Sequence, residues 1–110
     1  NKVVILEKNV FGGCENLNEI TIPYGVINIG DGAFEECKSL REVSIPDSVA
    51  SIGDYAFWNC QSLNQITVWS NVTSIGYSAF DGCKNLTIRA FKGSYAERYA
   101  LENEIPFEEI

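Results

Sequence analysis

Apolar residues recur along this chain at intervals of 23 residues. One column is phenylalanine, one is cysteine and one is leucine: Phe11, Phe34, Phe57 and Phe80; Cys14, Cys37, Cys60 and Cys83; Leu17, Leu40, Leu63 and Leu86. With further columns of Ile or Val, Gly and Ala, one unit reads F-x-x-C-x-x-L-x-x-I-x-I-P-x-x-V-x-x-I-G-x-x-A. The intervening positions are mostly polar, so the unit specifies which side chains face a core. Self-similarity at this period predicts a repeat solenoid.

Each unit contains a short segment of alternating polarity. In the segment 42–45 two side chains point inward and two outward if the backbone is extended. Pro23 and Pro46 directly follow such segments and end the strand, because proline has no N–H to donate. Strands one period apart cannot pair through hairpins, so we predict parallel pairing in register between neighbouring coils. The segment 49–52 is predicted to form a second, shorter strand.

Glycine and aspartate mark the corner that follows the second strand. Gly30, Gly53 and Gly76 allow a sharp turn there. Asp31 or Asp54 is then placed to cap a short helical turn through the segment Ala-Phe-x-x-Cys.

The repeats are expected to fill one domain, residues 1–110. Its parts are a partial repeat at 1–10, full repeats at 11–33, 34–56 and 57–79, a divergent last repeat at 80–92 and a C-terminal cap at 93–110. The chain begins inside a repeat, so we expect a longer array and an exposed apolar edge at the N-terminus. In the last repeat Arg89 stands where the strand Ile should be, and Ile88 takes that role one residue early.

The cap is predicted from helix signals. Ser94 followed by Glu97 is a capping box, and apolar residues then recur at helical spacing. Asn103 can end this short amphipathic helix, and residues 105–107 are expected to form a last edge strand that Glu108 and Glu109 end. The prediction is a helix-strand cap.

Composition excludes several classes of function. The 15 acidic residues outnumber the 8 basic ones, and the net charge of −7 argues against binding to nucleic acid. The longest apolar run near the N-terminus, residues 3–6, is too short for insertion into a membrane. Histidine is absent, so the commonest general base and transition-metal ligand are both missing. We predict no catalytic residue, no metal and no cofactor.

The repeated unit resembles the BspA-like leucine-rich repeat, a class named for a bacterial surface protein. The match covers residues 3 to 88, and the tail, with Gly-Ser-Tyr-Ala-Glu-Arg-Tyr-Ala and Ile-Pro-Phe, is similar to the segment that often closes such arrays. Trp69 departs from the unit by standing where Pro23 and Pro46 stand in earlier repeats. The resemblance implies a right-handed superhelix with a parallel β-sheet on the concave face and short helical turns on the convex side. It also implies a secreted or cell-surface protein, mostly bacterial, that adheres to host matrix proteins or to other cells.

The four cysteines are expected to be buried free thiols. All four stand in the same inward-facing column, whereas a disulfide needs Cα atoms within about 7 Å and side chains that face each other. Disulfides and a zinc site are the alternatives, and the long spacing without histidine disfavours zinc.

Polar strand positions form candidate rows for binding a partner. With one aromatic residue they are Asn18, Glu19, Thr21, Arg41, Glu42, Ser44, Asn64, Gln65, Thr67 and Trp69. One interpretation is that they pave the concave face for a protein partner; the other is that they are ordinary solvent-facing strand residues. Tyr24, Tyr55, Trp58 and Tyr77 also lie outside the apolar columns and are candidate anchors or edge-packing residues.

These observations predict a non-enzymatic module for protein binding or adhesion, extracellular or on a cell surface. Its expected partner is a host matrix protein or another cell-surface protein. A monomer is expected, with the N-terminal edge as the place where copies would associate. Two alternatives stay open, a rigid structural spacer and an accessory domain of a larger enzyme.

Overall fold

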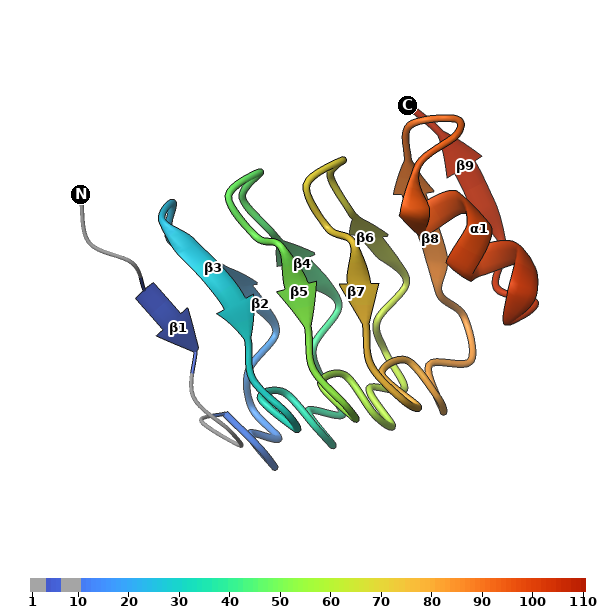
Figure 1. Cartoon of the computed structure of the whole chain (residues 1–110). Coiled ribbons are helices and arrows are strands. Elements are labelled where there is room, and N and C mark those ends of the chain that lie inside the picture. The colour runs from blue at the N-terminus through green and yellow to red at the C-terminus, as the bar shows by residue number, and fades with distance from the viewer. Residues whose placement is uncertain (1–3, 7–10) are drawn as a thin grey trace.

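The chain folds as a solenoid of parallel strands (Figure 1). The computed structural model describes residues 4–6 and 11–110. One sheet has the order β2-β4-β6-β8-β9, and its strands are β2 (Glu19–Thr21), β4 (Glu42–Ser44), β6 (Gln65–Thr67), β8 (Thr87–Ala90) and β9 (Phe107–Glu109). The other has the order β1-β3-β5-β7, with β1 (Val4–Leu6), β3 (Val26–Ile29), β5 (Ser51–Ile52) and β7 (Ser74–Ile75). Both strands predicted within a coil are confirmed.

Neighbouring strands pair in the predicted register. Val43 lies opposite Ile66, one period away, and Ile66 lies opposite Ile88. The last pairing confirms that the frame shifts by one residue in the divergent repeat. At the N-terminal end Leu6 pairs with Ile29, as the repeat frame requires.

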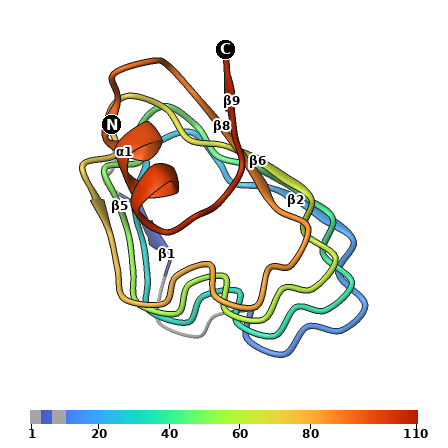
Figure 2. The same ribbon diagram turned by 90° about the vertical axis from the view of Figure 1, so that its right-hand side faces the viewer.

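The apolar columns fill the space between the two sheets. Phe34 and Phe57 are fully buried, and the rings of successive Phe residues stack with centroids 5.2–5.3 Å apart and planes within 10° of parallel. This stacking makes the core a continuous ladder along the solenoid, because each ring packs against the ring of the next coil. Figure 2 looks along this stack and shows the coils superposed around one interior.

Single hydrogen-bonded turns form the edge at which the chain passes from the four-stranded to the five-stranded sheet. We call residues 11–17, 30–40, 53–63 and 76–86 the turn edge. Cys37 N donates to Phe34 O at 3.2 Å, and Leu40 N donates to Cys37 O at 3.1 Å. Glu36, inside the first of these turns, has φ of 60°, so the turns do not join into a continuous helix.

The prediction that Asp31 and Asp54 cap their own turns is wrong. Asp31 Oδ1 accepts a hydrogen bond from Asp54 N at 2.8 Å, and Asp54 Oδ1 accepts one from Tyr77 N at 2.8 Å. Each aspartate therefore binds the next coil. A Cβ on Gly53 would lie 2.5 Å from Asp31 Oδ1, so glycine is needed here for this close approach.

The C-terminal cap consists of helix α1 (Tyr95–Glu102) and strand β9. Ser94 Oγ accepts from Glu97 N as predicted, while Glu97 Oε1 accepts from Gly93 N at 2.6 Å. Asn103 is the C-cap. The last strand lies two residues later than predicted, because Pro106 contributes only its carbonyl, which accepts from Ile88 N at 2.8 Å. The two glutamates predicted to end the strand lie inside it.

Candidate functional site

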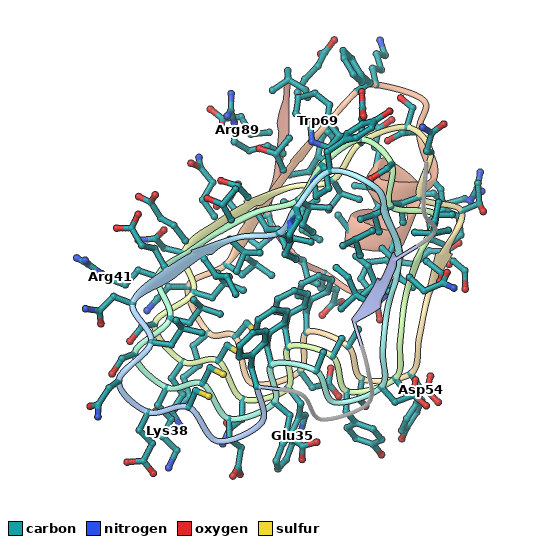
Figure 3. All side chains as sticks on the ribbon, turned by 90° about the vertical axis from the view of Figure 1, so that its left-hand side faces the viewer. Glu35, Lys38, Arg41, Asp54, Trp69 and Arg89 are labelled. Carbon is teal, nitrogen blue, oxygen red and sulfur yellow. The ribbon has the colours of Figure 1, made fainter. Side chains whose placement is uncertain are left out.

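Nine of the ten candidate residues lie on or directly before the strands of the five-stranded sheet, on its outer side, which we call the strand face; Trp69 lies at the corner after β6. Eight of the ten are exposed: Asn18, Glu19, Thr21, Arg41, Glu42, Ser44, Asn64 and Gln65. Thr67 and Trp69 are partly buried. Figure 3 shows Arg41 and Arg89 pointing outward on this same side.

Parallel pairing sets these side chains into rows. Glu19 lies opposite Glu42, and Glu42 opposite Gln65. Thr21 lies opposite Ser44 in a second row. Asn18 and Arg41 stand in a third row, where Arg41 N donates to Asn18 O at 2.8 Å. The strands thus bring together side chains that are a full repeat apart in the sequence.

The strand face extends further than the sequence indicated. Thr67 pairs with Arg89, and Arg89 with Glu108 of the cap. The Nε atom of Arg89 lies 3.0 Å from Glu108 Oε1, an ion pair that lacks the angle of a hydrogen bond. Ile88 in the strand position signals that Thr87 and Arg89 face outward. No repeat column points to Glu108.

A groove lies where the strand face meets the cap. Its volume is about 530 Å³, and its lining residues are Asn64, Gln65, Thr87, Pro106, Phe107 and Glu108. Amide, hydroxyl and carboxylate groups dominate this lining, so the groove offers hydrogen bonds more than apolar contact. It continues the polar rows into the cap.

Trp69 is held from within the chain. Its indole Nε1 donates to Ile45 O at 2.7 Å, and its ring lies 6.2 Å from that of Phe91. This hydrogen bond ties the corner after β6 to the preceding coil, where Pro46 ends the equivalent strand. A partner would therefore meet the exposed part of the Trp69 ring, since the N–H is already bonded.

The thiols are free, as predicted, and serve packing, but the prediction that all four are buried is wrong for Cys14 and Cys83, which lie in the outermost coils. Cys37 and Cys60 are buried, and Cys14 and Cys83 are partly exposed. Cys37 Sγ donates to Phe11 O at 3.0 Å, and Cys60 Sγ donates to Phe34 O at 3.1 Å. The pKa of Cys37 is raised, mainly by burial. Contact with Cys83 and burial raise that of Cys60. A raised pKa keeps these thiols protonated and weakly nucleophilic.

Two further features bear on function. Within residues 4–6 and 11–110, no group of three or more His, Cys, Asp and Glu residues is placed to hold a metal ion. In the same part of the chain, no helix has the length and apolar character needed to cross a membrane.

A stack of short parallel strands whose coils share apolar columns and a leucine at each turn defines a leucine-rich repeat protein. The chain belongs to the BspA type leucine rich repeat family, whose model matches residues 1–107 in six copies. No curated protein matches the chain.

Solved bacterial structures are similar to it. A leucine rich cell surface protein from Faecalibacterium prausnitzii is 42% identical over 76% of this chain and 22% of its own, with a TM-score of 0.73. A leucine-rich repeat protein from Bacteroides ovatus is 36% identical over 97% of this chain and 28% of its own, with a TM-score of 0.84. A leucine rich repeat protein from T. pallidum is 26% identical over 78% and 51%, with a TM-score of 0.61. The chain thus spans less than a third of the first two structures.

Proposed function

We propose that this chain is a non-enzymatic module that binds a protein partner through the strand face and serves adhesion at a cell surface. The observation that carries the proposal is a set of adjacent rows of exposed polar side chains with no internal role. Glu19, Thr21, Arg41, Glu42 and Gln65 make no side-chain hydrogen bond or ion pair within the described residues. Their polar groups are free to contact a partner without first breaking internal bonds.

The comparisons support the cell-surface location. The relative from Faecalibacterium prausnitzii is described as a cell surface protein. Host matrix proteins and other cell-surface proteins are the proposed partners, and the chain acts as a monomer. Self-association would use the N-terminal edge, where Phe11 and Leu17 are only partly buried.

The test is a set of substitutions on the strand face. The variant Arg41→Ala/Glu42→Ala/Gln65→Ala/Thr67→Ala should lose binding to purified host matrix proteins in surface plasmon resonance, while its melting temperature stays nearly unchanged. Binding retained by this variant would contradict the proposed surface.

Two control variants place the contact. Lys38→Ala/Gln61→Ala/Lys84→Ala changes exposed residues of the turn edge, which Figure 3 shows to border the strand face rather than oppose it. Thr73→Ala/Ser74→Ala changes exposed residues at β7 in the other sheet. Both variants should bind as the parent does.

A rigid spacer or an accessory domain of an enzyme is the second candidate, because the chain covers only 22% and 28% of the first two solved structures. If a longer array bound none of the matrix or cell-surface proteins tested, the spacer would be favoured. If the strand-face variant bound normally while both control variants lost binding, the adhesive surface would lie on the turn edge and the four-stranded sheet instead.

A further inference from the structure

Three aromatic side chains outside the repeated columns meet on the turn edge. The ring centroid of Tyr55 lies 5.7 Å from that of Tyr77 and 6.2 Å from that of Trp58, with interplanar angles of 79° and 84°. Tyr55 is 41% exposed and Tyr77 is 72% exposed. We call these three residues the aromatic patch. It lies away from the groove at the cap, to whose lining none of the three belongs.

Packing of the solenoid does not require these rings. The same positions in neighbouring coils hold small or acidic residues: Gly32 and Ser78 for Tyr55, Glu35 and Asp81 for Trp58, and Asp54 for Tyr77. The backbone is nevertheless the same, since φ is 62° at Gly32, 57° at Tyr55 and 53° at Ser78. The aromatic patch is therefore a local departure from a repeat that folds without it.

Tyr55 occupies a position that disfavours a large side chain. Its φ of 57° is left-handed, a conformation that glycine adopts freely and that crowds any residue with a Cβ. In the preceding coil this position is Gly32. Strained residues cluster at functional sites, so an exposed aromatic ring at such a position points to a role outside folding.

The polar groups of the aromatic patch are unused within the described residues. The Tyr55 and Tyr77 hydroxyls and the Trp58 indole N–H make no hydrogen bond there. Exposed rings with free donors are typical of residues that anchor a protein partner.

Carboxylates border the rings. Asp54 precedes Tyr55 and accepts from Tyr77 N, and Asp81 stands in the row of Trp58, where Asn59 N donates to Asp81 O at 2.7 Å. Neither aspartate forms an ion pair within the described residues. Figure 3 shows Asp54 pointing outward from the turn edge. The surroundings of the aromatic patch are therefore negative.

We propose that the aromatic patch binds a lysine- or arginine-rich segment of a partner protein. A cation within about 6 Å of a ring centroid is attracted to the ring face, and the neighbouring carboxylates add opposite charge. The net charge of −7 favours the approach of such a partner. This surface is separate from the strand face, so either proposal can fail without the other.

The test uses the whole chain and a fluorescein-labelled oligolysine peptide in fluorescence anisotropy. The variant Tyr55→Gly/Trp58→Glu/Tyr77→Asp installs residues that neighbouring coils already carry and adds two acidic groups. If the rings make the contact, affinity falls roughly tenfold. Plain charge attraction would instead strengthen binding. Equal or tighter binding by the variant, or no binding by the parent chain, overturns the proposal.

Two single variants and one control variant keep the test independent of folding. Tyr55→Gly alone removes one ring of the aromatic patch and should weaken oligolysine binding. Because glycine also relieves the left-handed strain at this position, the melting temperature should not fall. Asp54→Asn retains the oxygen that accepts from Tyr77 N but removes the charge, and should also weaken binding. The quadruple strand-face variant Arg41→Ala/Glu42→Ala/Gln65→Ala/Thr67→Ala should bind oligolysine as the parent does. If both single variants bound like the parent, the aromatic patch would not be the site.

Discussion

The two ends of the solenoid bury the same columns to different extents. At the C-terminal end, Phe80 is 4% exposed and Leu86 is 2% exposed beneath the cap. At the N-terminal end the equivalent residues Phe11 and Leu17 are only partly buried. Sequence at these positions is identical, so burial in a stack is set by the neighbours on both sides and not by the residue alone.

The cap covers the last coil with a helix and a strand instead of another repeat. Tyr99 of α1 packs its ring edge-on to Phe80, with centroids 6.1 Å apart. Ile75 N donates to the Tyr95 hydroxyl at 3.3 Å, and Ala96 and Ala100 are buried. A short helix and one strand thus cover the apolar columns that the next repeat would otherwise cover.

The largest expected effect compares an interior ring with the terminal one. Phe57→Ala removes a ring that stacks on both sides and should lower the free energy of unfolding by about 3–5 kcal/mol. Phe11→Ala should cost clearly less, because Phe11 is partly exposed and stacks on Phe34. Urea denaturation followed by circular dichroism measures both. Equal losses of unfolding free energy in the two variants would contradict the conclusion that burial of a ring depends on the coils on both sides of it.

A smaller effect tests the cap. Ser94→Ala removes the side chain that accepts from Glu97 N and should cost about 1 kcal/mol of stability. Because α1 covers the last repeat, the same variant should speed alkylation of Cys83 relative to the parent. Ser70→Ala is the matched control, because Ser70 lies at an exposed corner and its side chain makes no hydrogen bond within the described residues; it should change neither quantity. Unchanged stability in Ser94→Ala would show that the helix is held without its cap residue.

An effect of similar size concerns the corner that departs from the repeat. Trp69→Phe keeps an aromatic ring but removes the indole N–H that binds Ile45 O, and should cost about 0.5–1.5 kcal/mol. Thermal melting of this variant beside Trp58→Phe, whose N–H makes no bond within the described residues, isolates the hydrogen bond. A larger fall in melting temperature for Trp58→Phe than for Trp69→Phe would contradict a stabilising role for the Trp69 hydrogen bond.

The fold could be predicted from the sequence wherever the same apolar pattern recurs in successive repeats. The spacing of Phe34, Phe57 and Phe80 determines which strands pair. In the last repeat a shift of one residue places Ile88 rather than Arg89 at the inward-facing position of the strand, so the apolar residue reveals the shifted frame. The capping box at Ser94 is likewise local, so it could be found without knowing the fold.

Contacts between coils were harder to predict. Asp31 looks like a helix cap in the sequence, yet its partner is Asp54 one repeat away, which depends on how closely the coils approach. The pairing of Arg89 with Glu108 requires knowing that the cap adds a strand beside β8. The meeting of Tyr55 with Trp58 and Tyr77 depends on side-chain directions at a left-handed turn, which the repeat pattern does not encode.

The cysteine column offers the most direct measurement, because four chemically identical side chains occupy one position in successive coils. Under denaturing, non-reducing conditions the chain should show four free thiols. In the native state, alkylation by iodoacetamide, followed peptide by peptide with mass spectrometry, should modify Cys14 and Cys83 well before the buried Cys37 and Cys60. Intramolecular disulfides, or equal rates at all four positions, would contradict a stack in which each coil is buried by its neighbours.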